Sequence, residues 1–122
     1  MALAVMLGAF GAHGLEGKIS DRYLDTYKTA NFYHFIHGLA ILALPSLQGS
    51  LTSRQLKFAF YTLLAGIALF SGSLYLLSLW EIFQMPQLKI LGAITPIGGL
   101  SFIMGWLYLA FCYMKSNRSA TA

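Results

Sequence analysis

The chain has 122 residues, enough for one domain, and it is 57% hydrophobic but only 10% charged, whereas soluble domains are nearer a quarter charged. A soluble domain of this length could not bury so much apolar surface, so the composition, with a mean hydropathy of +0.66, excludes an ordinary soluble protein and predicts an integral membrane protein. The net charge of +4 and the pI of 9.4 do not indicate nucleic-acid binding, because the basic residues flank the apolar segments, where lysine and arginine reach lipid headgroups.

The first apolar segment covers residues 1–15. At about 1.5 Å per residue this helix would be roughly 22 Å long, which is shorter than the hydrocarbon core of about 30 Å. A secretory signal peptide would begin with a basic region, and none precedes this apolar run. We therefore expect a membrane helix that either sits short in the bilayer or belongs to a chain that starts further upstream.

The second helix is expected to begin at Ser20, a favourable N-cap, with Asp21 in its first turn, and to close at Pro45. Residues that recur at steps of three and four mark one continuous face of this helix. They are Tyr23, Tyr27, Ala30, His34, His37, Ile41 and Leu44. Only residues 29–47 are apolar, so the N-terminal end of the helix is expected to project beyond the membrane.

The third and fourth segments are longer. Residues 56–80 form an apolar run with one charged residue, Lys57, at its start, and residues 88–114 could also span but contain Thr95-Pro96. Because proline removes a hydrogen bond and clashes with the preceding turn, the helix is either kinked there or capped by Thr95 and started at Pro96. The sequence thus predicts an all-α, four-helix antiparallel transmembrane bundle, a single domain over residues 1–122, with its last helix kinked or interrupted near Thr95-Pro96.

Small residues recur along three of the segments, the first stripe being Ala4, Gly8 and Ala12. In lipid, close backbone approach at small residues holds helices together. The alternative is that the glycines only reflect the higher glycine content of membrane helices. We interpret the following as helix-packing positions: Gly8, Gly11, Gly66, Gly72, Gly98 and Gly105. The single cysteine, Cys112, excludes an internal disulfide and is expected to be a small buried hydrophobe.

Several strings occur in a characteristic order: GAFGAHG at 8–14, YHFIHGLA at 33–40, LFSGSLY at 69–75, ITPIGG at 94–99, and then Gly105-Trp106. This order resembles the domain-of-unknown-function 423 family, small bacterial inner-membrane proteins related to the transmembrane-protein-256-like proteins. The resemblance covers nearly the whole chain. It implies a four-helix membrane protein, and it carries over no activity, cofactor or catalytic residue.

Three histidines form the candidate polar or ligand cluster: His13 ends the first segment, and His34 and His37 lie three apart on the second. Antiparallel neighbours would bring all three toward the same membrane surface, and ionisable groups within a membrane are functional candidates. They could hydrogen-bond and hold helices together, handle protons or a small solute, or bind a metal or haem. The carboxylates lie in the connections, and Glu16 is the one candidate to join the histidines as a metal ligand.

We expect no enzymatic activity and no cofactor, and the sequence leaves metal binding open. The leading hypothesis is a non-enzymatic structural or accessory component of the membrane. We expect it in the bacterial inner membrane, with the lipid bilayer and further copies of the chain or other membrane proteins as its partners. The alternatives are a small transporter or channel for protons or a small solute that uses His13, His34 and His37, and a metal- or haem-binding membrane protein. Lysine and arginine are equally numerous on the two sides. We expect both termini in the cytoplasm, because the basic residues on that side lie directly beside span ends.

Overall fold

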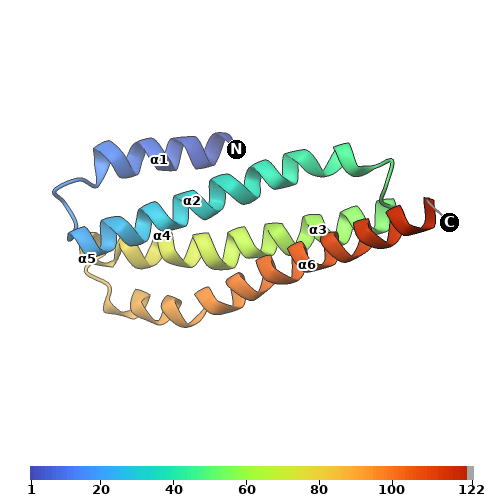
Figure 1. Ribbon diagram of the computed structural model, residues 1–122. Coiled ribbons are helices and arrows are strands. Elements are labelled where there is room, and N and C mark those ends of the chain that lie inside the picture. Colours follow the sequence, from blue (N-terminus) through green and yellow to red (C-terminus); the bar gives the residue numbers. More distant parts are fainter. Residues whose placement is uncertain (121–122) are drawn as a thin grey trace.

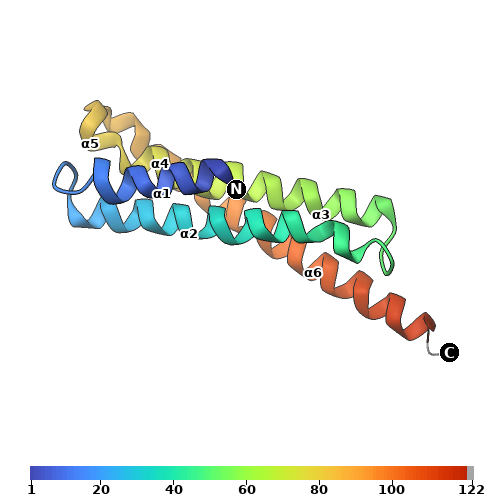
Figure 2. The same cartoon turned by 90° about the horizontal axis from the view of Figure 1, so that it is seen from above.

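The computed structural model describes residues 1–120, and every regular element in that range is helical (Figure 1). The N-terminal half consists of α1 (Ala2–Gly14), α2 (Asp21–Ala43) and a short 3-10 helix, η1 (Leu44–Leu47). Helix α1 lies beside the first half of α2, so the N-terminus sits partway along the molecule (Figures 1 and 2).

The C-terminal half begins with a continuous helical rod made of α3 (Ser53–Gly66), a π-helical turn η2 (Ile67–Ser71) and α4 (Gly72–Ser78). The chain then turns through α5 (Trp80–Phe83) and the 3-10 helix η3 (Pro86–Ala93) and returns along the rod as α6 (Thr95–Ala120). Figure 2 shows the C-terminal end of α6 diverging from α2 and α3.

The starts of α3 and α2 are held in different ways. Helix α3 opens with a capping box: the Thr52 hydroxyl accepts from the Gln55 N–H at 3.3 Å, and the Gln55 side chain accepts from the Thr52 N–H at 2.8 Å. Helix α2 begins after Ser20, as predicted, but the Ser20 side chain makes no capping bond within its own helix. Its hydroxyl and its N–H instead donate to the carboxylate of Glu81, at 3.1 and 2.8 Å.

The rod of α3, η2 and α4 is the scaffold on which α2 and α6 pack, while α1 packs on α2. The continuous face of α2 that the sequence predicts points inward. The seven residues that define it, from Tyr23 to Leu44, are each buried or half-buried. One cluster of buried side chains includes Leu15, Tyr27 and Tyr75 near the α1–α2 connection. A second cluster, near the α2–α3 connection, includes Leu44 and the predicted buried cysteine, Cys112.

Two helical stretches, Ser53–Ser78 and Pro86–Arg118, are long and apolar enough to cross a membrane by length and composition. Only 22% and 17% of their most apolar windows are buried inside the molecule, whereas the core helix of a soluble protein would be mostly buried. The surface of the molecule carries many exposed large apolar side chains, among them Phe32 and Leu42 on α2 and Phe111 on α6. A soluble monomer rarely exposes so much apolar surface. Helix α1 is also apolar, but its 13 residues make it shorter than these two stretches.

The interruption of the last segment lies one residue earlier than predicted. A 3-10 helix ends at Ala93, and α6 begins at Thr95, with Pro96 in its first turn. Backbone N–H groups in the first turn have no partner within the helix, so a proline there removes no helical hydrogen bond. Thr95 does not act as the cap. Its hydroxyl pairs with the Ser73 hydroxyl on α4 at 2.8 Å, and the carbonyl of Ile94 accepts the first N–H groups of the helix.

Candidate functional site

The three histidines do not form one cluster. His13 is exposed near the end of α1 and has no hydrogen-bond partner among the described residues, whereas His34 and His37 lie inside the molecule on α2. In residues 1–120 no group of three or more His, Cys, Asp or Glu side chains could hold a metal ion. His13, exposed on α1, therefore joins His34 and His37 in no such metal-holding group.

A polar network joins α1, α2 and α4, and its centre is Asn31. The Asn31 amide donates to the carbonyl of Ala4 at 2.7 Å and to the Tyr75 hydroxyl at 3.0 Å. The same hydroxyl lies 3.4 Å from Nδ1 of His34. One side chain of α2 thus connects helices on both sides of it, and buried polar groups that are hydrogen-bonded in this way stabilise and orient neighbouring helices.

Tyr27, one turn before Asn31, makes a second connection to α1. Its hydroxyl donates to the carbonyl of Leu7 at 2.9 Å, and its ring packs edge-on against Tyr75 with centroids 4.8 Å apart. The side chain is 1% exposed. Sequence reasoning placed Tyr27 on the inward face but missed the network, although an asparagine inside an apolar helix is itself a signal, since its amide must find partners there.

The glycines of α1 make these two contacts sterically feasible. A Cβ at Gly8 would lie 2.9 Å from Oδ1 of Asn31, and a Cβ at Gly11 would lie 2.6 Å from the Tyr27 ring. Both distances are shorter than real Cβ contacts, so larger residues would push α2 away from the α1 carbonyls. Ala12, expected on the same face, is exposed, and the buried face instead runs through Ala4 and Gly11.

A second seam of glycines joins α6 to the rod. A Cβ at Gly98 would meet the backbone of η2, 2.7 Å from both Leu69 C and Phe70 Cα, and a Cβ at Gly105 would lie 2.8 Å from the Thr62 hydroxyl. A Cβ at Gly66 would press into the ring of Phe102.

Gly72 differs from the other predicted packing glycines. Its nearest neighbour within 4 Å would be the Ile67 carbonyl of its own rod, at 3.9 Å. It therefore lies beside no other helix at close range.

His37 is nearly buried, at 5% exposure, and its orientation is well defined. Nδ1 lies 2.8 Å from the carbonyl of Tyr33, and because a carbonyl can only accept, Nδ1 must carry the proton. The imidazole stacks on Phe102 of α6, with centroids 3.5 Å apart and planes 17° apart. His37 therefore bridges α2 and α6 by ring stacking.

The π-helical turn η2 lies where the rod meets the start of α6. Ser71, in this turn, is fully buried, and its hydroxyl has no hydrogen-bond partner in the described part of the chain. Ser73 follows and bonds to both the Phe70 carbonyl and Thr95. The π-turn of the rod and the interrupted start of α6 therefore lie next to each other. Turns of π-helix are frequent at functional sites.

Polar and aromatic residues close the end of the molecule where α1 meets α2. The Glu81 carboxylate accepts a hydrogen bond from the Ser20 N–H. The rings of Tyr23 and Trp80 pack edge to face with centroids 5.6 Å apart, and the amine of Lys89 lies 3.9 Å from the centre of the Trp80 ring. Aromatic and basic side chains of this kind are typical of a membrane–water interface.

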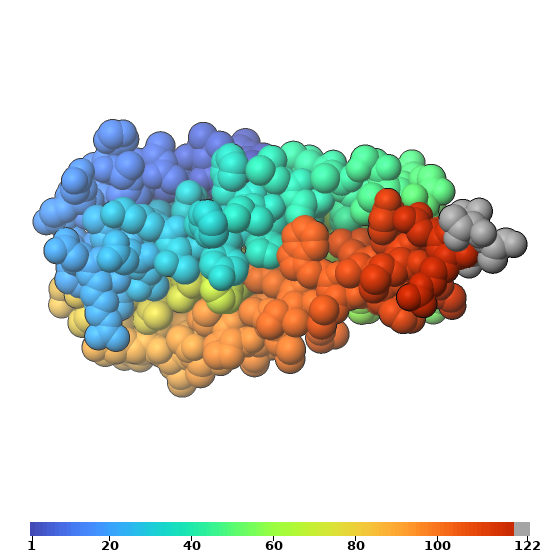
Figure 3. Space-filling model, viewed as in Figure 1, coloured from blue at the N-terminus to red at the C-terminus, as the bar shows by residue number. Residues whose placement is uncertain are grey.

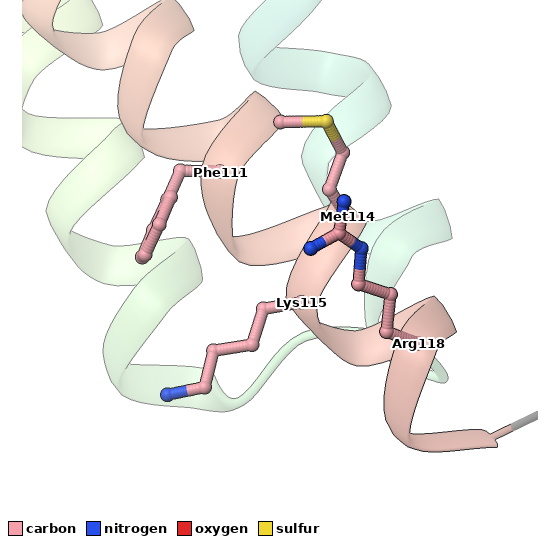
Figure 4. A pocket seen from close by; sticks show the side chains of 4 residues that line it. All are labelled: Phe111, Met114, Lys115 and Arg118. Carbon is pink, nitrogen blue, oxygen red and sulfur yellow. The ribbon is translucent and has the colours of Figure 1, made fainter. Parts of the chain in front are cut away.

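At the opposite end, a hollow of about 250 Å³ lies along the last turns of α6, lined by Phe111, Met114, Lys115 and Arg118. Figure 4 shows the guanidinium of Arg118 beside Met114, whereas the amine of Lys115 extends away from it. Apolar side chains with basic groups beyond them match the end of a membrane span, where lysine and arginine extend toward headgroups.

The interior of the described residues contains few polar side chains. The buried polar side chains among the described residues are His37, Ser71, Ser73 and Ser78, and none is a carboxylate or an ammonium group. Glu16 lies in the α1–α2 connection, Asp21 and Asp25 lie in the first two turns of α2, and Glu81 lies in α5. Asp25 forms an exposed pair with Lys28 at 3.7 Å.

Comparison with known proteins identifies relatives along most of the chain. The model of the family described as "Protein of unknown function (DUF423)" matches residues 7–99. A UPF0382 membrane protein of Staphylococcus epidermidis is 49% identical over 113 residues, which cover 93% of this chain and 87% of that protein. The UPF0382 membrane protein YwdK of Bacillus subtilis is 46% identical over 114 residues, or 93% and 88% of the two chains. No solved structure matches the chain.

Proposed function

Since the chain belongs to the DUF423 family, we propose that it is a multi-pass membrane protein with four crossings, without enzymatic activity, and that it acts as a structural or accessory component for other membrane proteins. Membrane localisation itself is supported by the names of its relatives, which are membrane proteins without an assigned activity. The observation that carries the accessory role is the use of the interior polar groups. Asn31, Tyr27 and Tyr75 hydrogen-bond helix to helix.

Two features support four crossings. Helix α2 has 23 residues, about 35 Å at 1.5 Å per residue, and it lies alongside the apolar rod. Helix α1 is shorter, about 20 Å, but its carbonyls are held by Asn31 and Tyr27 of α2, so it enters the bilayer packed against a longer partner. The proposed location is the bacterial inner membrane.

The proposed orientation places the α2–α3 connection and the C-terminus in the cytoplasm. Arg54 and Lys57 in the first turns of α3 and Lys115 and Arg118 near the end of α6 lie on this side, adjacent to the proposed spans. Reporter fusions near Ser53 and after Ala122, a residue outside the described range, should both give cytoplasmic signals. Opposite signals would require an odd number of crossings between the two points and would refute the model.

The accessory role is tested by extracting the tagged protein in native-lipid polymer discs and reconstituting it in liposomes. We expect one membrane-protein partner in constant ratio, whose recovery is reduced when an exposed apolar residue at the contact is changed to a charged one. We also expect proton and cation flux equal to that of protein-free liposomes. Flux above that background, with no partner in constant ratio, would refute the accessory role.

A small transporter is the second candidate, and one observation favours it: the π-turn η2 and the interrupted start of α6 meet at Ser73 and Thr95. Discontinuous helices form binding sites in transporters. In this case, Ser71→Ala and Thr95→Val would abolish a measured flux while leaving thermal unfolding nearly unchanged. A metal- or haem-binding role has less support, because His13 lies apart from His34 and His37.

A further inference from the structure

The groove between α2 and α6 is a hollow of about 460 Å³. Both helices pack on the rod, and their own connection across the groove is made by side chains, chiefly the stack of His37 on Phe102. The two helices form neighbouring parts of the face seen in Figure 3, one cyan and one orange. The lining residues are Tyr33, His37, Phe70, Gly99, Phe102, Ile103, Trp106 and Leu107. The volume lies within the roughly 300 to 1,000 Å³ of small-molecule sites.

The walls are aromatic and already ordered. Tyr33 stacks at 12° to His37 with centroids 5.8 Å apart, and its ring lies 4.6 Å from that of Phe70. Trp106 contributes a third wall at 6.1 Å from the imidazole, and it is 45% exposed, so it lines the open side of the hollow. Flat, partly exposed rings around one hollow favour a flat ligand over a flexible chain, because stacked rings need no rearrangement to accept it.

Besides Nδ1 of His37, which is bonded to Tyr33, the lining side chains carry three polar groups: the Tyr33 hydroxyl, the Trp106 indole N–H and Nε2 of His37. Of these, Nε2 of the neutral imidazole is the one that can only accept a hydrogen bond. Because Nδ1 of His37 donates to Tyr33, Nε2 of the neutral ring carries a lone pair, and no group among the described residues hydrogen-bonds to it. Among the described residues, the side-chain atoms that have no hydrogen-bond partner and are completely buried are Ser71 Oγ and Trp80 Nε1. Nε2 of His37 also has no partner but is not among these completely buried atoms. It therefore has access to the hollow that His37 lines. An acceptor on an apolar wall selects a ligand that donates a hydrogen bond.

We infer that this groove binds a lipid-soluble aromatic ring that carries a hydroxyl group, of the hydroquinone class, with the hydroxyl donating to Nε2 of His37. A lipid acyl chain has no donor for this atom. An anionic headgroup has no cation to meet, since none of the lining side chains is lysine or arginine. A metal ion would find one nitrogen ligand and no carboxylate or thiolate. The inference concerns binding alone and goes beyond the proposed accessory role.

Tryptophan fluorescence can report on the site directly. The chain has two tryptophans, and Trp80 belongs to the cluster with Tyr23 and Lys89 at another place in the fold. A Trp80→Phe background leaves Trp106 as the reporter. The protein in lipid nanodiscs is titrated anaerobically with a short-chain hydroquinone and, as matched control, with the same ring bearing two methoxy groups, which cannot donate.

We expect saturable quenching of Trp106 by the hydroquinone, with an affinity about tenfold higher than for the dimethoxy ring, the effect of one hydrogen bond. His37→Phe keeps a ring to stack on Phe102 but removes Nε2, so it should reduce the hydroquinone affinity to that of the control ligand. His34→Phe, the same change on the same helix outside the groove, should leave it unchanged. Gly99→Leu, which extends a side chain into the hollow, should reduce both affinities while His37 remains.

Each result decides the inference, with circular dichroism confirming that the variants are folded. Equal affinities for the two ligands, or quenching that does not saturate, would overturn it. So would a folded His37→Phe protein that still prefers the hydroquinone. If His37→Phe does not fold, the ligand pair on the parent protein and the Gly99→Leu variant decide: retained quenching in Gly99→Leu places the ligand elsewhere.

Discussion

Replacing Gly98 with alanine tests the contact between the start of α6 and the π-turn of the rod. The added Cβ would lie 2.7 Å from Leu69 C and Phe70 Cα and would also press on Phe70 N. These are backbone atoms, so no side chain can rotate out of the way, and α6 and η2 would have to separate by about 1 Å to reach normal packing distances. Overpacking of this kind typically costs about 1 to 3 kcal/mol.

Gly72→Ala is the matched control for this change. Its Cβ would have one neighbour within 4 Å, the Ile67 carbonyl at 3.9 Å. Alanine is favoured over glycine inside a helix by about 0.5 to 1 kcal/mol, so this variant should be as stable as the parent or more stable. The same gain applies to Gly98→Ala and offsets part of its penalty. We therefore expect Gly98→Ala to be less stable than Gly72→Ala by about 2 kcal/mol.

The assay is reversible unfolding of the purified protein in mixed micelles by increasing SDS, followed by far-ultraviolet circular dichroism. A second measurement identifies the obstacle. At Gly66 the atoms in the way belong to the Phe102 side chain, so Phe102→Leu should restore part of the stability lost in Gly66→Ala. Phe70→Leu should not restore Gly98→Ala, because there the backbone is in the way. Equal stability of the Gly98→Ala and Gly72→Ala proteins would refute the reasoning.

Three further predictions concern polar contacts. Asn31→Leu should lower the free energy of unfolding by about 1 to 3 kcal/mol, because it removes the two hydrogen bonds that Asn31 makes, one to α1 and one to α4. In a double-mutant cycle with Tyr75→Phe, the two losses of stability should not add. Simple additivity would contradict the network. Thr52→Ala should lower the free energy of unfolding by about 1 kcal/mol in the same assay, because it removes the capping box of α3. The control Ser53→Ala should lower it less. Equal losses in the two variants would argue against the cap. His37→Leu should lower thermal stability without changing metal content measured by plasma mass spectrometry; one equivalent of zinc or copper lost with the imidazole would instead favour a metal site.

The resemblance read from five short strings is confirmed by the family match over residues 7–99. The strings contain some of the residues that carry the tertiary contacts, whereas Tyr27, Asn31 and Phe102 lie outside them. Gly8 and Gly11 lie in the first string, His34 and His37 in the second, Tyr75 in the third and Gly98 in the fourth. Close backbone approach and ring stacking tolerate few residue types at these positions.

Sequence periodicity by itself determined the helices and the buried face of α2, because a step of three or four residues is a property of a single helix and needs no knowledge of its neighbours. The interruption close to Thr95 also followed from a local rule, since the missing N–H of proline acts within one turn. The start of α2 after Ser20 was placed correctly, although the Ser20 side chain bonds to Glu81 and not to its own helix.

The partners of each face were decided only by the tertiary structure. Asn31 and Tyr75 are 44 residues apart, and no local pattern specifies that α4, and not another apolar helix, lies beside α2. The rotation of α1 about its axis was equally undetermined. Ala12 and Gly11 are both small, and the bonds from Tyr27 and Asn31 to the α1 carbonyls turn Gly11 inward and leave Ala12 and His13 exposed. The histidines separate for the same reason, because proximity along helices becomes proximity in space only after packing sets the rotation of each helix.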